Sequence, residues 1–298
     1  MAQLDYVGNE TAHQTWGFPL NPAVYTSGSP TANYSKRFRL YLENPSQGDM
    51  FTGGGSSVLI ADSATANYNG LIATIQHRAA NFTFLANYTW SHCLDVADAS
   101  GDIGGGSVED PYNPGLDRGN CDFDHRGMFN ANGVATSRFT SLHGPVAAVV
   151  NNWEIGPLLR ITDGSVFTVG DGTDISGTDV GHDRPNQVSS NVYTHNTISK
   201  DQTYINQSPF TYQADGTYGN LARNTFRGPR SFNLDAELSR YFPVNERMKF
   251  DLRIEAFNVL NHPNFDSPGH TNLNQSSFGV ITGSGAARIF QGAVKFVF

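Results

Sequence analysis

Charged residues are scarce in this chain of 298 residues, at 15% of the total, whereas an average soluble domain has roughly 25%. Acidic residues outnumber Lys and Arg, which leaves a net charge of −8 and no cluster of basic residues. A nucleic-acid partner would require such a cluster. No apolar run approaches the ~20 residues that a membrane-spanning helix needs. The composition therefore disfavours both a nucleic-acid-binding protein and a helical membrane protein.

Cysteine is also scarce, since only Cys93 and Cys121 occur. An even number is compatible with one disulfide in an oxidising compartment, and two unpaired thiols are equally compatible with it. The residues that follow Met1, AQLDYVGN, contain neither the basic segment nor the apolar segment of a secretion signal. We therefore expect no signal peptide within this sequence.

Long runs of Ala, Leu, Glu and Lys, which favour helices, are missing as well. The chain has instead 31 Gly and 20 Phe, with many Asn and Thr. These residue types favour strands and turns. The composition therefore predicts an all-β protein.

The last twelve residues, 287–298, show the clearest strand pattern. Side chains alternate between the two faces of a strand, and here one face is apolar and aromatic while the other is mixed and partly charged. The apolar face carries Phe290, Gly292, Val294, Phe296 and Phe298. A strand between lipid and a wet lumen has this pattern, and so does a half-buried strand of a soluble sandwich.

Alternation of the same kind predicts about eight strands in all. They are an N-terminal strand that ends near Gly8 and the segments 67–78, 81–93, 127–136, 152–162, 231–241, 249–257 and 287–298. We also expect a short strand at 38–42. The connections alternate between short and long, and long structureless loops are unusual in a compact soluble domain. Outer-membrane barrels combine short periplasmic turns with long extracellular loops.

Charged residues on two neighbouring strands support the barrel. They lie on the face opposite the apolar one, and they are Asp235, Glu237, Asp251, Arg253 and Glu255. Charges in these positions fit a hydrated lumen. We therefore predict an antiparallel transmembrane β-barrel, with these five residues facing the lumen. The alternative is a secreted or surface β-sandwich that binds a glycan or a protein partner through its long loops.

Several longer motifs resemble TonB-dependent receptors of the Oar-like kind. The motifs are residues 66–71 (ANYNGL), 84–93 (FLANYTWSHC), 183–186 (DRPN), 218–224 (YGNLARN), 227–229 (RGP) and 253–265 (RIEAFNVLNHPNF). The resemblance implies a 22-stranded barrel in the outer membrane of a Gram-negative bacterium. It also implies a periplasmic plug through which the inner-membrane TonB energy complex drives the uptake of a bulky substrate. The substrate itself is not indicated.

The number of strands limits what this chain can be within such a receptor. About eight strands are predicted, and neither a plug nor a TonB-contacting segment is recognised. We therefore expect residues 1–298 to be the C-terminal part of a single barrel domain in contact with outer-membrane lipid. A closed eight-stranded barrel is the alternative, because eight strands suffice for closure.

The resemblance also assigns roles to individual residues. Phe290, Val294, Phe296 and Phe298 resemble the terminal signal that the barrel-assembly machinery recognises. Cys93 and Cys121 flank the acidic loop 94–126, whose bordering strands are expected to be neighbours. A disulfide that closes this loop is therefore the favoured state, in part because of the resemblance, and two free thiols remain the alternative.

Neither catalysis nor a cofactor is expected. Asp124 and His125 adjoin, but no nucleophile in an elbow motif accompanies them, and the histidines lack the spacing of metal ligands. The acidic segments 95–124 and 171–179 offer carboxylates of the kind that calcium prefers. Neither segment has the spacing of an EF-hand loop, and we interpret both as solvated surface loops.

Overall fold

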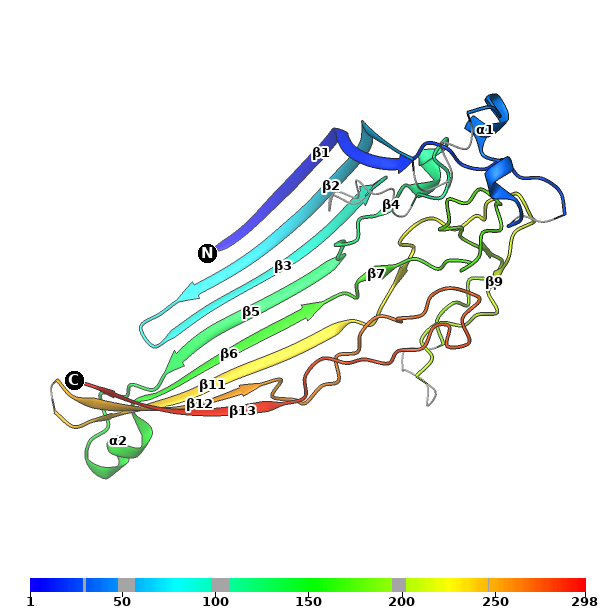
Figure 1. Cartoon of the computed structure of the whole chain (residues 1–298). Coiled ribbons are helices and arrows are strands. Elements are labelled where there is room, and N and C mark those ends of the chain that lie inside the picture. The colour runs from blue at the N-terminus through cyan, green and yellow to red at the C-terminus, as the bar shows by residue number, and fades with distance from the viewer. Residues whose placement is uncertain (29–30, 48–56, 98–107, 195–201, 246) are drawn as a thin grey trace.

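One twisted antiparallel sheet dominates the computed structural model, which describes residues 1–28, 31–47, 57–97, 108–194, 202–245 and 247–298 (Figure 1). Its long strands follow one another in chain order, each paired with the next. They are β1 (Ala2–Pro19), β2 (Val58–Arg78), β3 (Phe82–Asp95), β5 (Gly127–Thr136), β6 (Trp153–Thr162), β11 (Ser231–Pro243), β12 (Lys249–Phe257) and β13 (Ile289–Val297). The short strand β4 (Gly119–Asn120) pairs with the end of β3.

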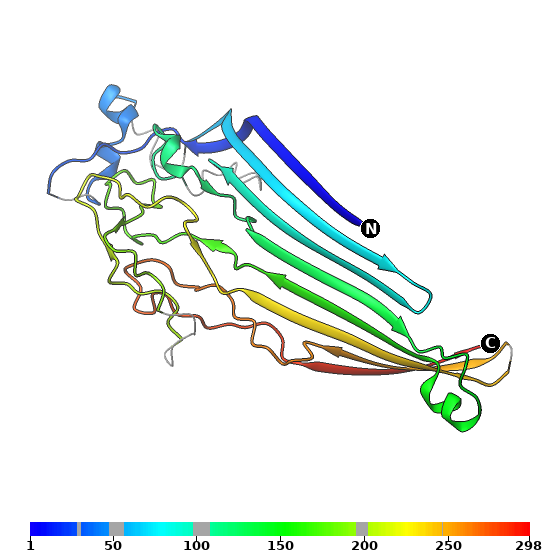
Figure 2. The same cartoon turned by 180° about the vertical axis from the view of Figure 1, so that it is seen from behind.

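The predicted all-β, antiparallel class is confirmed. A sandwich requires two sheets packed face to face, whereas the eight long strands share one sheet. The β-sandwich alternative is therefore wrong. Within the described residues the sheet is open, because no pairing joins β1 to β13; these two strands lie at opposite edges (Figure 2).

The first two strands are much longer than predicted. β1 continues to Pro19 and not just to Gly8, and β2 begins at Val58. The register between them shifts twice, between Thr11 and Gln14 and again before Trp16. Such bulges insert residues and interrupt the two-residue period, so the pairing continues where the alternation in the sequence does not.

The predicted short strand at 38–42 is also wrong. Helix α1 (Arg39–Glu43) forms there, and the side-chain Oδ1 of Asn21 accepts a hydrogen bond of 2.9 Å from the backbone N–H of Leu40. Phe38, at its N-cap, is buried. A run of five residues is too short for periodicity to separate a strand from a helix.

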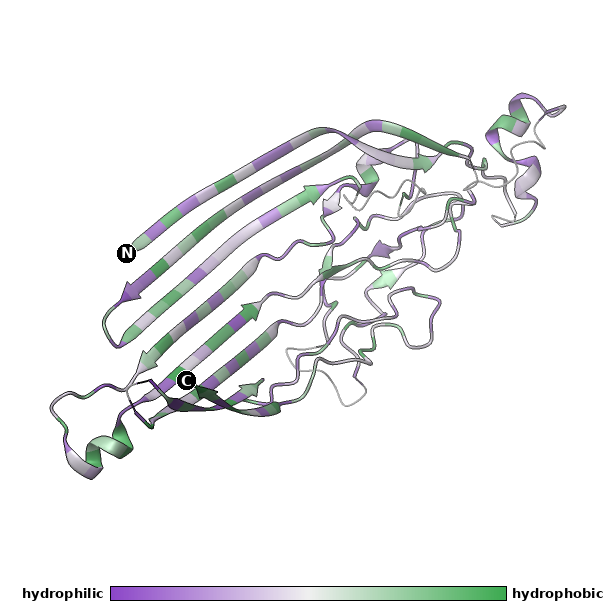
Figure 3. Cartoon of the chain, turned by 60° about the vertical axis from the view of Figure 1, so that its left-hand side comes forward, coloured by the Kyte–Doolittle hydropathy of each residue, from purple (hydrophilic) through white to green (hydrophobic). Residues whose placement is uncertain are grey.

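The sheet register aligns apolar side chains across neighbouring strands. One row runs through Leu4, Ala73, Tyr88, Phe129, Ile161 and Phe232. A second row joins Ile155, Leu238 and Ile254. Many of these side chains are uncovered (Leu4 is 67% exposed), and apolar segments recur along the strands in Figure 3. An exposed apolar patch of this extent marks a surface that meets a protein or a membrane.

The connections divide between the two ends of the sheet. The shorter ones, 79–81, 137–152 and 244–248, lie at one end, and helix α2 (Gly144–Val150) is part of the second. The long ones gather at the other end (Figures 1 and 2). We call the described residues of these long connections the loop layer; it comprises parts of 20–57, 96–126, 163–230 and 258–288.

The loop layer has a hydrophobic core of its own. Two short strand pairs brace it: β7 (Val166–Phe167) with β10 (Phe226–Arg227), and β8 (Asn186–Gln187) with β9 (Phe210–Thr211). Its buried core residues are Phe167, Val169, Val192, Ile205, Phe210, Leu221, Phe226, Leu273 and Phe278. The rings of Phe210 and Phe226 meet edge to face at 5.5 Å, a favourable geometry for aromatic pairs. The long connections are therefore folded.

The helices in the described ranges are all too short or too polar to cross a membrane.

Candidate functional site

Arg184, in the 183–186 motif, ties two long connections together. Its guanidinium contacts Glu109 at 2.5 Å and Asp117 at 2.9 Å, and it also donates to the carbonyl of Leu221 at 2.9 Å. Its backbone N–H donates to the other carboxylate oxygen of Glu109 at 2.8 Å. Arg184, Glu109 and Asp117 are each at most 1% exposed. Buried charges of this kind are tolerated when they are paired and hydrogen-bonded.

Two further arginines repeat the arrangement. Arg223, in the 218–224 motif, pairs with Asp95 and, at 3.4 Å, with Asp122. Arg227, in the 227–229 motif, pairs with Asp124. The resemblance motifs of the loop layer therefore supply three arginines to the carboxylates of the acidic loop and its border.

The interpretation of the acidic loop as solvated is wrong for four of its carboxylates. Asp95, Glu109, Asp117 and Asp124 are buried and paired with arginine. Asp98 and Asp102 lie outside the described residues. These arginine–carboxylate ion pairs could not be predicted from the sequence, because the two partners of each pair are 67 to 128 residues apart. One feature of the sequence could have indicated these ion pairs: an acidic loop and three arginines in the motifs occur together in a chain with few charged residues.

Cys93 and Cys121 form a disulfide at the base of the acidic loop. Their Cα atoms are 5.4 Å apart, and 28 residues separate them in sequence. The backbone N–H of Cys93 donates to Asp124 at 2.6 Å, and that of Cys121 donates to the carbonyl of Cys93 at 3.2 Å. The disulfide and the Asp124–Arg227 pair thus hold the same part of the loop against β3.

Burial changes the proton affinity of several acidic groups in this layer. It raises the pKa of Glu109 to about 8, although the adjacent Arg184 guanidinium opposes the rise. It raises the pKa of Asp171 and of Asp183 to about 6, against the hydrogen bonds from Gln213 and Ser176 respectively. Burial disfavours the charged form of a carboxyl group. The loop layer therefore holds protons at a pH where free carboxyl groups have lost them.

The second acidic segment, 171–179, is not uniformly solvated either, since Asp171 is buried and accepts a hydrogen bond of 2.7 Å from the side-chain amide of Gln213. Asp174 accepts from the backbone N–H groups of Gly177 and Asp179, both at 2.7 Å, and from the hydroxyl of Tyr34 at 2.6 Å. Within the described ranges, no group of three or more His, Cys, Asp or Glu side chains is arranged to hold a metal ion. The segment is a hydrogen-bonded turn.

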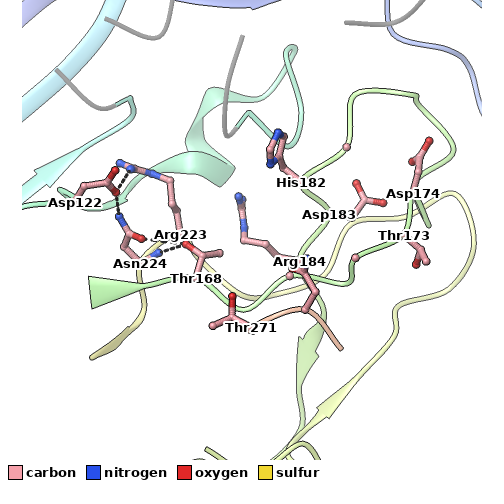
Figure 4. Close-up of a pocket in the computed structure, with 14 residues that line it drawn as sticks. Asp122, Thr168, Thr173, Asp174, His182, Asp183, Arg184, Arg223, Asn224 and Thr271 are labelled. Carbon is pink, nitrogen blue, oxygen red and sulfur yellow. Dashed lines mark hydrogen bonds and ion pairs between the residues drawn. The ribbon is translucent and has the colours of Figure 1, made fainter. Parts of the chain in front are cut away.

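A polar cavity of about 450 Å³ lies between these networks (Figure 4). Its labelled lining residues are Asp122, Thr168, Thr173, Asp174, His182, Asp183, Arg184, Arg223, Asn224 and Thr271. The charges of both arginines are balanced by the carboxylates described above. The cavity wall therefore offers hydroxyl, amide and carboxylate groups, which suit a ligand rich in hydrogen-bonding groups.

The five residues predicted to face a lumen lie on the sheet face opposite the apolar rows. Arg253 joins three of them, at 3.1 Å to Glu237 and at 3.7 Å to both Asp251 and Glu255. Asp235 lies apart and accepts a hydrogen bond of 2.8 Å from the backbone of Asn258. The structure therefore brings four of the five together, and their contact with a lumen stays a prediction.

The four residues of the predicted assembly signal share the apolar face of the sheet edge. Val294 lies opposite Leu252 of β12, and Phe296 lies opposite Phe250 with their rings 4.8 Å apart. The exposed fractions are 65% for Phe290, 70% for Val294, 43% for Phe296 and 91% for Phe298. The side chains are thus accessible along one edge, and their recognition by the assembly machinery stays a prediction.

Comparison with known protein families gives a match. The family described as outer membrane beta barrel domain matches residues 1–291, nearly the whole chain. No curated protein matches the chain.

Proposed function

The chain belongs to the outer membrane beta barrel domain family, and on that premise we propose that it is part of the barrel of a TonB-dependent receptor. The family gives it a location in the outer membrane of a Gram-negative bacterium and a role of the transport or receptor type. The receptor would take up a bulky substrate with energy from the inner-membrane TonB complex. The sequence motifs at 84–93, 218–224 and 253–265 support this narrower assignment.

The two faces of the sheet support an orientation in the membrane. The apolar rows would contact outer-membrane lipid, as in known barrels. Arg253 and the three carboxylates that it contacts would line the water-filled interior. The loop layer would face the outside, because long loops are extracellular and short turns periplasmic in this architecture. The polar cavity would then lie where a substrate first meets the receptor.

The open sheet is the single observation that carries the assignment to a larger barrel. Among the residues that the structure describes, β1 and β13 each have one edge without a strand partner. Within a membrane every backbone N–H and C=O group requires a partner, so both edges must be paired there. We propose that further strands of a larger barrel pair with them. The loop layer supports this, because a folded layer with nine buried core residues suits the mouth of a wide barrel.

Disulfide cross-linking tests the size of the barrel. Cysteines are introduced in pairs at apolar-face positions of β1, starting with Leu4→Cys, and of β13, starting with Val294→Cys. The protein is then oxidised in outer membranes. In a larger barrel no β1–β13 pair forms a disulfide, whereas Leu252→Cys with Val294→Cys forms one because the register places them opposite. Efficient β1–β13 cross-linking at any register would show that the eight strands close on themselves.

Binding to the energy complex tests the TonB assignment separately. The native protein that contains this barrel is solubilised from outer membranes and passed over the immobilised periplasmic domain of TonB. Retention that competes with free TonB domain is the expected result. A protein that passes through unretained, while a known TonB-dependent receptor is retained on the same column, would contradict energy coupling and leave the barrel assignment intact.

A further inference from the structure

Helix α2 lies at the end of the sheet opposite the loop layer, between β5 and β6 (Figure 1). Its sequence, GPVAAVV, contains no charged residue. Val146 is 59% exposed and Val149 is 64% exposed, and Phe139 just before the helix is 51% exposed. At this end of the barrel strands, a short apolar helix therefore leaves Val146 and Val149 largely uncovered by the described part of the chain.

The helix is fastened to the apolar face of the sheet. The indole N–H of Trp153 donates to the carbonyl of Val149 at 2.9 Å, and the guanidinium of Arg240 donates to the carbonyl of Ala148. Trp153 and Arg240 are cross-strand partners of β6 and β11. They share a face with Ile155 and Leu238, two positions further along these strands, because side chains two apart point the same way.

Arg240, which bonds the helix, also contacts two aromatic rings. Its guanidinium lies over the ring of Trp153 at 4.9 Å and over that of Phe242 at 4.7 Å. Such cation–π contacts strengthen when water is excluded. Trp side chains are typical of the boundary between hydrocarbon and headgroups, and Arg side chains lie there with the charged group toward water.

The local charge differs from that of the whole chain. The connection 137–152, SRFTSLHGPVAAVVNN, contains one Arg and one His but no Asp or Glu, while the chain carries a net charge of −8. Arg138 is exposed in this connection. An apolar helix beside an exposed cation suits an anionic phospholipid surface, since attraction to anionic headgroups adds to apolar burial.

We propose that α2 is an interfacial anchor that inserts Val146 and Val149 among the phospholipids of the membrane leaflet at the short-connection end, with Arg138 at their anionic headgroups. This proposal rests on the proposed function, because it requires the apolar face to meet lipid. It assigns lipid binding to the connection between β5 and β6. It also assigns a role to Trp153 and Arg240, which hold the helix on the lipid side.

Spin-label accessibility tests the position of the helix. Single cysteines are introduced in the full chain at Val149, at Val188 and at Val294, and a nitroxide is attached to each. Val188 is the matched control, because it is 63% exposed in the loop layer. Val294 reports on the barrel itself. Collisions with oxygen, which partitions into lipid, are compared with collisions with a water-soluble nickel chelate.

The expected result is a several-fold higher ratio of oxygen to nickel collisions at Val149 than at Val188. A ratio at Val149 equal to that at Val188, with a high ratio at Val294, would overturn the anchor and leave the membrane barrel in place. A low ratio at Val294 as well would overturn the proposed function. These outcomes separate the two proposals.

Lipid composition tests the headgroup contact. The protein is reconstituted in vesicles of phosphatidylcholine alone and in vesicles that also contain phosphatidylglycerol. The label at Val149 should move deeper with phosphatidylglycerol, and Arg138→Gln should abolish that shift. An equal shift in Arg138→Gln would exclude Arg138 as the headgroup ligand. No shift in either protein would overturn the preference for anionic lipid.

Discussion

Arg184 illustrates at the residue scale how this chain uses its few charges. One guanidinium satisfies two carboxylates and the carbonyls of Leu116 and Leu221, all on segments far from Arg184 in sequence. The net stabilisation from a buried ion pair is small, because desolvation offsets the attraction. Removal of the arginine is costly, because its carboxyl partners are left buried without their hydrogen-bond donor. Arg184 therefore contributes mainly to the arrangement of the loops.

The first prediction concerns the removal of this arginine. Arg184→Ala should destabilise the loop layer by about 3–5 kcal/mol, because Glu109 and Asp117 lose their partner. Limited proteolysis of the membrane-embedded protein measures the effect as faster cleavage within 108–124. Arg118→Ala is the matched control, since Arg118 is an exposed arginine of the same connection; it should leave the cleavage rate nearly unchanged. Equal cleavage rates for the two variants would contradict the role of Arg184.

The second prediction concerns pH. The folded-state pKa values of Glu109, Asp171 and Asp183 are raised from 4.5, 3.8 and 3.8 to about 8, 6 and 6. The folded loop layer therefore binds more protons than the unfolded one from about pH 4 to about pH 8. Its stability falls as pH rises through this interval, with all three groups contributing up to about pH 6 and Glu109 alone above it. Hydrogen exchange of the loop layer at several pH values, corrected for the intrinsic rate, measures this.

A single variant tests whether Glu109 causes the decrease in stability between pH 6 and 8. Glu109→Gln should flatten the change in stability between pH 6 and 8, because Gln does not titrate. Loop stability that rises over this interval in the wild type would contradict the raised pKa of Glu109.

At the scale of the element, periodicity determined what could be predicted. The predicted strand at 249–257 coincides with β12, because every second residue from Phe250 to Ala256 is apolar. The prediction of β1 ends at Gly8 because the following residues lack sustained alternation, and bulges interrupt the period of the strand after Thr11. The loop layer was beyond prediction, because contacts such as Arg223–Asp95 join segments 128 residues apart and leave no local pattern.

The third prediction concerns the disulfide. Replacing both Cys93 and Cys121 by Ser should destabilise the acidic loop by about 3–4 kcal/mol, from the entropy of closing a loop of this length. Hydrogen exchange in 108–124 should accelerate, while exchange in β12 should not change. Unchanged exchange in the loop would show that the arginine pairs alone hold it.

The fourth prediction concerns the terminal strand. Phe298→Ser should lower the amount of folded protein in the outer membrane several-fold, because the last aromatic residue of the proposed assembly signal is lost. The measure is the band that shifts in electrophoresis when the sample is heated. Val297→Ser, on the opposite face of the same strand, should have a smaller effect. Equal losses would point to general damage to β13.

At the scale of the whole molecule, one sheet has an apolar face, a charged face and a folded layer at one end. The order of strands, the antiparallel pairing and the position of the long connections agree with the sequence analysis. The polar cavity and the arginine network do not follow from it, since they depend on how four connections pack together. Function as a membrane barrel therefore requires that the apolar face of the sheet meets lipid.

Fluorescence quenching along β12 tests this claim most directly. Single cysteines at Leu252, Arg253, Ile254 and Glu255 are labelled with a small fluorophore, and the protein is placed in vesicles with brominated phospholipids. If the apolar face meets lipid, quenching should be strong at Leu252 and Ile254 and weak at Arg253 and Glu255, because successive residues of a strand face opposite sides. Uniform quenching, or quenching that is strongest at Arg253 and Glu255, would contradict it.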